Sequence, residues 1–227
     1  MASKPKVHPT SSTKIVITPR TAKQAEYLDL INSNYITFCI GPAGCGKTFL
    51  PCLQAMKDLQ EGSVRKIILV RPSVTAGEDI GYLPGTLEEK MDPLMAPLYD
   101  AFNEYWQPQL IEDFLADGTI EIVPLAFMRG RTFRNAFIIA DEAQNTTQDQ
   151  MKMLLTRFGD DCRMVICGDV SQNDLKHFQV SGLRAGLKLA KWGVTGVASF
   201  EFDVEDVVRH PVVRDILMGW DELGLDE

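Results

Sequence analysis

The octapeptide GPAGCGKT at residues 41–48 constrains the fold more than any other part of the sequence. It follows the apolar segment TFCI and precedes a segment of helical periodicity. The spacing GxxxxGK, followed by Ser or Thr and placed between a strand and a helix, is the pattern of a phosphate-binding loop. The sequence therefore predicts an α/β fold in which the first strand-to-helix turn binds the phosphates of a nucleotide.

The residue types of this loop match what a phosphate group needs. Glycine lets several backbone N–H groups point toward one anion, and the N-terminus of the following helix adds partial positive charge. Lys47 supplies a full positive charge for catalysis, and the Thr48 hydroxyl is placed to hold Mg²⁺. The alternative is that the glycines only form a tight turn. We assign nucleotide binding to nine consecutive residues: Gly41, Pro42, Ala43, Gly44, Cys45, Gly46, Lys47, Thr48 and Phe49.

Two other apolar segments lead into polar side chains. The segment FIIA is followed by Asp141 and Glu142, and the segment RMVIC leads within a few residues to Gln172. Because ligands bind at the carboxyl ends of parallel strands, we expect Asp141 to hold Mg²⁺ together with Thr48. We expect Glu142 to polarise the attacking water, and the Gln172 amide to donate to a γ-phosphate oxygen and accept from that water. For both segments the alternative is a solvated polar turn.

Short β-branched segments alternate with longer helical ones along the rest of the chain. Such alternation predicts βαβ units and an α/β fold with a mostly parallel sheet covered by helices on both faces. Residues 1–13 are expected to be a flexible leader, residues 14–227 one domain, and the Pro- and Gly-rich residues 71–98 an excursion from the sheet. Strands are expected at residues 37–40, 66–70, 119–123, 137–140, 163–167 and 194–200, and helices at residues 47–60, 85–106, 111–117, 147–158, 181–192 and 211–222.

Composition narrows the functional classes. The chain has 23 basic and 31 acidic residues, for a net charge of −8, which argues against coating duplex DNA but leaves room for a local basic groove. The longest apolar runs are too short for a membrane crossing. The five cysteines lack paired CxxC spacing, so we expect reduced thiols in a cytoplasmic protein. Cys45 is expected to be either a small packing residue or a redox-sensitive thiol activated by the helix N-terminus.

Longer motifs make the sequence resemble the PhoH family of P-loop ATPases, which are single-domain relatives of superfamily-one helicases. The matching motifs are TPRTAKQ at residues 18–24, RPSVTAGEDIGYLPG at 71–85, RGRTF at 129–133, DEAQN at 141–145, GDVSQND at 168–174 and DVVRHP at 206–211, besides the phosphate loop. The resemblance implies a RecA-type P-loop NTPase fold, ATP as the substrate and Mg²⁺ as the cofactor. It also matches Gln24 to a glutamine that reads adenine, although the local sequence equally fits a solvated helix residue.

The resemblance further implies ATP hydrolysis coupled to remodelling of, or translocation on, single-stranded nucleic acid, with RNA as the expected partner. An arginine beside the γ-phosphate accelerates such hydrolysis, and in two-lobed helicases the second lobe supplies it. This chain has room for one lobe. We therefore expect the arginine to come from the chain's own tail or from a neighbouring copy in a homo-oligomer such as a hexameric ring. Arg209 is the first candidate, ahead of Arg214 and Arg184, and its alternative is a surface ion pair with Asp206.

A short basic cluster offers a nucleic-acid contact. Arg129, Arg131 and Arg134 lie near Phe127 and Phe133 in the sequence, a combination that suits phosphate binding and base stacking. The alternatives are an Arg131 that lies at the nucleotide phosphates, or a solvated loop. Two other functions would use the same phosphate loop: a phosphotransferase without nucleic-acid coupling, and a nucleotide-gated interaction module.

Overall fold

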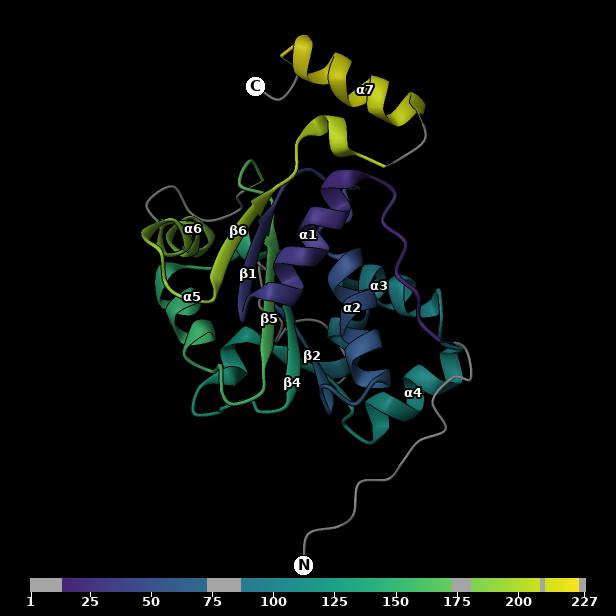
Figure 1. The fold of residues 1–227 in the computed structure, drawn as a ribbon, viewed down its shortest axis with the longest axis vertical. Coiled ribbons are helices and arrows are strands. Elements are labelled where there is room, and N and C mark those ends of the chain that lie inside the picture. Colours follow the sequence, from purple (N-terminus) through teal and green to yellow (C-terminus); the bar gives the residue numbers. More distant parts are fainter. Residues whose placement is uncertain (1–13, 73–86, 173–180, 209–210, 225–227) are drawn as a thin grey trace, which may run out of the picture.

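The computed structural model describes residues 14–72, 87–172, 181–208 and 211–224, which form one parallel sheet and its covering helices (Figure 1). The sheet has six strands in the order β3-β2-β4-β5-β1-β6, and every neighbouring pair is parallel. All carboxyl ends therefore lie at one edge of the sheet. The strands are β1 (Ile36–Ile40), β2 (Lys66–Arg71), β3 (Ile120–Pro124), β4 (Ala136–Ala140), β5 (Arg163–Gly168) and β6 (Val197–Glu201). All six overlap the strands predicted from sequence, with ends that differ by up to three residues.

Helices cover both faces of this sheet, as the sequence predicts. Helices α1 to α4 contribute to one buried cluster and α5 and α6 to the other. The helices are α1 (Ala22–Ser33), α2 (Phe49–Gln60), α3 (Leu87–Asn103), α4 (Pro108–Ala116), α5 (Gln148–Leu155), α6 (Gly182–Trp192) and α7 (Pro211–Glu222). Short 3₁₀ turns follow three strands, at η2 (Leu125–Met128), η3 (Ala143–Asn145) and η4 (Val204–Asp206). Within the described residues, no helix is long and apolar enough to cross a membrane.

The alternation of side chains along β4 shows how the sheet divides these two clusters. Phe137 and Ile139 pack with α1 to α4, whereas Ile138 packs with α5 and α6. Successive residues of a strand point to opposite faces, and here both faces are apolar because both are covered. This explains why the central strands read as continuous apolar runs in the sequence.

Helix α1 is the one described helix that the sequence analysis did not predict. Its Thr21 cap accepts a hydrogen bond from the Gln24 N–H at 3.1 Å. The buried residues Gln24, Tyr27, Leu28 and Ile31 follow the i, i+3, i+4, i+7 spacing of one helix face. A capping residue followed by this spacing is a signal that could have revealed the helix. It was obscured because the face is short and begins with an amide rather than an apolar side chain.

Helix α6 approaches β1 closely because one of its residues has no side chain. A Cβ atom added to Gly186 would overlap the ring of Phe38, a fully buried residue of β1. By contrast, a Cβ atom added to Gly219 in α7 would meet no atom within 4 Å. Close packing therefore requires glycine at Gly186, whereas no contact requires it at Gly219.

We expect the substitution of alanine at these two glycines to have opposite effects. Gly186→Ala forces Phe38 or the helix to shift and should lower the free energy of unfolding by about 1–3 kcal/mol. Gly219→Ala is the matched control and should raise it by about 0.5–1 kcal/mol through helix propensity. Urea unfolding followed by circular dichroism measures both. A Gly186→Ala protein as stable as the unmodified chain would contradict the close packing of α6 on β1.

Candidate nucleotide-binding site

The turn between β1 and α2 has the backbone shape of an anion cradle. Gly44 and Gly46 have φ angles of +90° and +95°, in the left-handed region where glycine is favoured. A Cβ atom at Gly46 would also come within 3.0 Å of the Gln24 side-chain amide. The left-handed conformation therefore favours glycine at this position, and a larger residue would also crowd the Gln24 amide. The alternative, a simple tight turn, does not explain why buried side chains donate hydrogen bonds to the carbonyls of this turn.

Gln24 is part of that support. Its Nε2 donates to the Cys45 carbonyl at 3.1 Å, and its Oε1 accepts from the Arg20 N–H at 2.8 Å. The side chain is buried, so the alternative of a solvated helix residue is wrong. The expectation that Gln24 also reads adenine stays a prediction.

Two further side chains, one from α1 and one from β5, hold the loop. The Tyr27 hydroxyl and the Cys167 thiol each donate to the Lys47 carbonyl, both at 2.9 Å. The Lys47 ammonium donates to the Pro42 carbonyl at 3.1 Å, so it lies across the loop. Burial raises the pKa of the Tyr27 hydroxyl well above its ordinary value, which keeps the hydroxyl protonated as a donor. Sequence reasoning missed Tyr27 and Cys167 because their role depends on how α1 and β5 pack.

The cysteine inside the loop is a packing residue. Cys45 is fully buried, and burial raises the pKa of its thiol. Activation by the helix N-terminus would lower that pKa, so the redox-sensitive alternative is not supported. The other four cysteines are also buried and free, which agrees with the prediction of reduced thiols.

The predicted metal ligands meet across two elements. The Thr48 hydroxyl, at the start of α2, donates to Oδ1 of Asp141 at 2.9 Å, where Asp141 follows β4 directly. Asp141 is buried, and its burial, followed by the negative charge of Glu142, raises the pKa of its carboxyl. A buried carboxylate beside a hydroxyl oxygen is a pair of hard oxygen donors that a divalent cation would stabilise. These two residues therefore fit a Mg²⁺ ion.

Glu142 is held at both of its oxygens. Arg71 forms an ion pair with Oε1 at 3.2 Å, and the Gln144 amide donates to Oε2 at 2.7 Å. The Glu142 backbone has a φ angle of +54°, a strained conformation for a residue with a side chain, which turns the chain sharply at the end of β4. Gln144 also accepts from the Asp169 N–H at 3.1 Å and so joins the ends of β4 and β5. Arg71 and Gln144 are site residues that the sequence analysis did not assign.

The remaining predicted site residues are not drawn into this group. Gln172 is exposed, and within the described ranges its side chain makes no polar contact with the loop. Arg184 donates to the Val170 carbonyl at 3.3 Å. Arg209 lies outside the described residues, and the side chain of Arg214 is likewise not described.

The segment after β6 crosses the phosphate loop. The Val208 N–H donates to the Gly44 carbonyl at 3.0 Å. Lys23 of α1 forms ion pairs with Asp203 and Asp206 at 2.6 and 2.7 Å, and these carboxylates raise the pKa of its ammonium. The Asp206 carboxylate is therefore already paired within the described structure, which leaves less reason to assign it to Arg209.

Two of the three arginines in the expected nucleic-acid cluster form ion pairs, and Arg129 is exposed. Arg131 pairs with Glu121 and lies over the ring of Phe133, which is buried, while Arg134 pairs with Asp160. Phe127 remains exposed. The ion pair with Glu121 places Arg131 at the β3 side of the molecule, so its alternative position at the nucleotide phosphates is not observed.

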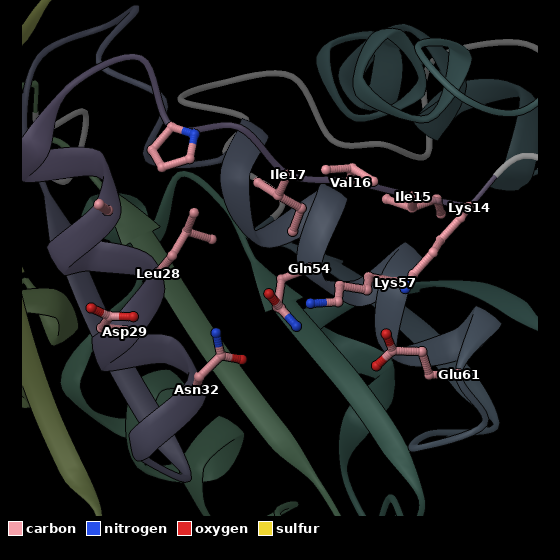
Figure 2. Close-up of a pocket in the computed structure, with 12 residues that line it drawn as sticks. Lys14, Ile15, Val16, Ile17, Leu28, Asp29, Asn32, Gln54, Lys57 and Glu61 are labelled. Atoms are coloured by element: carbon pink, nitrogen blue, oxygen red, sulfur yellow. The ribbon is translucent and has the colours of Figure 1, made fainter.

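A separate cleft of about 390 Å³ lies between residues 14–17, α1 and α2 (Figure 2). Its polar lining mixes amides with charges of both signs, and none of the assigned nucleotide-binding residues lines it. The polar side chains around it are Lys14, Asp29, Asn32, Gln54, Lys57 and Glu61. The mixed charges favour no ligand class, so we assign it no ligand.

The geometry is that of a P-loop nucleotide site, and comparison with known proteins identifies the family. A family model described as PhoH-like protein matches residues 16–221. The chain belongs to the PhoH family. A PhoH-like protein of Synechocystis sp. is 47% identical over 206 residues, which make up 91% of this chain and 62% of that protein. A PhoH-like protein of Bacillus subtilis is 48% identical over 203 residues, which make up 89% and 63%.

The chain thus spans less than two thirds of the length of these family members. A solved SWI2/SNF2 ATPase core of Sulfolobus solfataricus, in complex with dsDNA, aligns with a TM-score of 0.47 at 11% identity, over 83% of this chain and 45% of that chain. Family membership confirms the resemblance seen in the motifs. The parallel sheet and the phosphate loop give this PhoH-family chain the architecture of a P-loop nucleotide site.

The buried charge of Asp141 should make its replacement stabilising. Asp141→Asn keeps an oxygen that accepts from Thr48 but removes the buried charge. Because the pKa of Asp141 is raised on folding, the folded chain binds more protons than the unfolded chain between the two pKa values, and stability falls as pH rises through that window. We expect Asp141→Asn to raise the melting temperature of the nucleotide-free protein by a few degrees at pH 7.

This gain should vanish below pH 3.8, the ordinary pKa of an Asp carboxyl, where Asp141 is protonated in both states. Mg²⁺ affinity, measured by titration calorimetry, should fall by at least the 10- to 100-fold that loss of a supporting residue causes. Asp100→Asn, at an exposed position of α3, is the control and should change neither quantity. If the melting temperature of Asp141→Asn at pH 7 is no higher than that of the unmodified chain, the buried carboxylate does not destabilise the protein and the prediction is wrong.

Proposed function

We propose that this chain is a Mg²⁺-dependent ATP hydrolase that couples ATP binding and hydrolysis to remodelling of, or movement on, single-stranded RNA. The observation that carries the proposal is the 2.9 Å contact between Thr48 and Asp141, with Glu142 anchored beside it. It brings together a phosphate loop, a pair of metal ligands and a candidate base from elements distant in the sequence. RNA as the partner follows from the motifs shared with PhoH-family ATPases.

Each residue has a distinct task in this reaction. The loop N–H groups and Lys47 bind the phosphates, while Thr48 and Asp141 would hold Mg²⁺, which neutralises charge on the β- and γ-phosphate oxygens when bound. Glu142 orients the attacking water and accepts its proton. Arg71 and Gln144 act as positioning residues, because they hold the two Glu142 oxygens in place.

The alternative functions use the same loop differently. A phosphotransferase needs an acceptor beside the γ-phosphate, whereas the cleft in Figure 2 lies away from the loop residues. A nucleotide-gated interaction module needs no base. The two anchors hold Glu142 in a fixed orientation beside Asp141, as water activation requires and as neither alternative needs.

A neighbouring subunit completes the site in this proposal. Arg71, the arginine that contacts the candidate base, is already paired with Glu142. The hydrogen bond from Val208 to Gly44 supports a tail that runs close to the nucleotide, and Arg209 is the next residue in the sequence. In a head-to-tail homo-oligomer, for example a hexameric ring, that arginine would act on the site of the adjacent copy.

The role of Glu142 can be separated from nucleotide binding. Glu142→Gln should lower the rate of free phosphate release from ATP by about 10²- to 10⁴-fold, because the amide cannot accept a proton. ATP affinity, measured by calorimetry with Mg²⁺ present, should change little. Glu112→Gln, at an exposed position of α4, is the control and should hydrolyse normally. Hydrolysis by Glu142→Gln at the unmodified rate, or transfer of the γ-phosphate to an acceptor instead of water, would contradict the proposal.

Mixing inactive subunits tests whether neighbours share a site. Lys47→Ala and Arg209→Ala should each abolish turnover alone. In an equal mixture, roughly a quarter of the interfaces join an intact Lys47 to an intact Arg209, so about a quarter of the activity should return. Light scattering with and without ATP should show the oligomer. Two inactive variants that stay inactive when mixed, in a protein that remains monomeric, would rule out the shared site.

A further inference from the structure

Helix α6 presents an exposed basic face that ends in an exposed tryptophan. Arg184, Lys188 and Lys191 are exposed and spaced at i, i+4 and i+7, so they lie along one side of the helix. The helix contains no acidic residue, although the whole chain has a net charge of −8. Trp192, its last residue, is 82% exposed. The exposed side of α6 is therefore positively charged on a protein whose net charge is negative.

These cations differ from two of the three arginines of the earlier cluster, whereas Arg129 is likewise exposed and without an acidic partner among the described residues. Arg131 and Arg134 are paired with Glu121 and Asp160. Within the part of the chain that the structure describes, Lys188 and Lys191 have no acidic partner, and Arg184 contacts only the Val170 carbonyl. The charges of α6 are therefore available to an external anion. The adjacent α5 contributes Lys152 and one acid, Asp149, so it does not cancel them.

The opposite side of α6 fixes this face in place. Leu183 is buried, and Gly186 lies against the ring of Phe38. At the N-terminus of the helix, the Gly182 N–H donates to the Thr146 carbonyl at 2.7 Å and Ser181 donates to the Gln144 carbonyl at 2.9 Å. Figure 1 shows α6 at the outside of the molecule, next to β6 and α5. Its basic side therefore points away from the sheet on a rigid support.

We propose that the α6 face formed by Arg184, Lys188, Lys191 and Trp192 binds a single-stranded polynucleotide. The three cations, spread over about 10 Å of helix at 1.5 Å per residue, bind successive phosphates, and the indole ring stacks on a base. This inference rests on the proposed function for the presence of a polynucleotide. It assigns that partner to a surface distinct from the arginine cluster.

The composition of the face favours a polynucleotide over an anionic membrane. A helix that lies in a membrane surface buries a continuous apolar side. The exposed apolar residues of α6 are Leu189 and Trp192, while its apolar side is occupied by the sheet. An exposed ring beside unpaired cations is the combination that single-stranded nucleic acids require, since every base has a face that can stack.

The residue that caps α6 is hydrogen-bonded to the segment that holds the candidate base, Glu142. Ser181 contacts the backbone of Gln144, and the Gln144 side chain donates to Glu142 at 2.7 Å. A strand bound on α6 would therefore restrict the segment that positions Glu142. The expected consequence is that a polynucleotide changes the rate of ATP hydrolysis.

The test measures binding of a fluorescein-labelled 20-nucleotide oligouridylate by anisotropy over a salt series, with the full chain. Lys188→Gln/Lys191→Gln should lower the slope of log affinity against log salt by about 1.4, because each phosphate contact on a single strand contributes about 0.7. Trp192→Ala should weaken binding by about 5- to 150-fold, and Trp192→Phe should restore most of it. Arg129→Gln/Arg134→Gln is the matched control and should leave the slope unchanged. Circular dichroism verifies that each variant is folded.

Three results would overturn the proposal, and they differ in what else they remove. Oligonucleotide binding that depends on Arg129 and Arg134 but not on α6 rejects this surface and leaves the proposed function intact. Loss of binding to phosphatidylserine vesicles, without loss of oligonucleotide binding, in the α6 variants makes the face a lipid contact. An unmodified chain that binds no oligonucleotide removes the RNA part of the proposed function as well, while phosphate release still tests the ATPase part.

Discussion

The hydrogen bond from Thr48 to the buried carboxylate of Asp141 joins the phosphate loop to the end of β4. Everything else in the site is arranged around it. The loop approaches from β1 and α2, and the acidic strand end approaches from the adjoining half of the sheet. Since burial disfavours the ionised form, the carboxylate destabilises the folded chain, and a bound cation would offset this cost. The local instability lies where the proposed reaction needs a negative charge.

The loop itself depends on contacts from segments that are distant in the sequence. Gln24 and Tyr27 reach it from α1, Cys167 from β5, and Val208 from the segment after β6. All four of these bonds engage loop carbonyls, which leaves the N–H groups of the loop for the proposed phosphate ligand. A binding site for an anion needs its acceptors turned away from the ligand, and these contacts hold several of them there.

Much of the fold could be predicted because the central strands are buried on both faces and therefore read as uninterrupted apolar runs. The meeting of Thr48 with Asp141 was also predictable, because a parallel sheet brings strand ends to one edge. Arg71 was missed because its contact with Glu142 depends on β2 and β4 being neighbours, and strand order is not encoded in spacing. Gln144 was missed because its amide joins two strand ends, which only the folded chain brings together.

The ion pairs of Lys23 with Asp203 and Asp206, together with the bond from Val208 to Gly44, tie the last part of the chain to its first helix and to the loop. Helix α1 and the segment after β6 thus meet beside the phosphate loop. A protein fused after α7 would be connected to the loop through this segment, so its movement would be transmitted to Gly44 through the Val208 hydrogen bond.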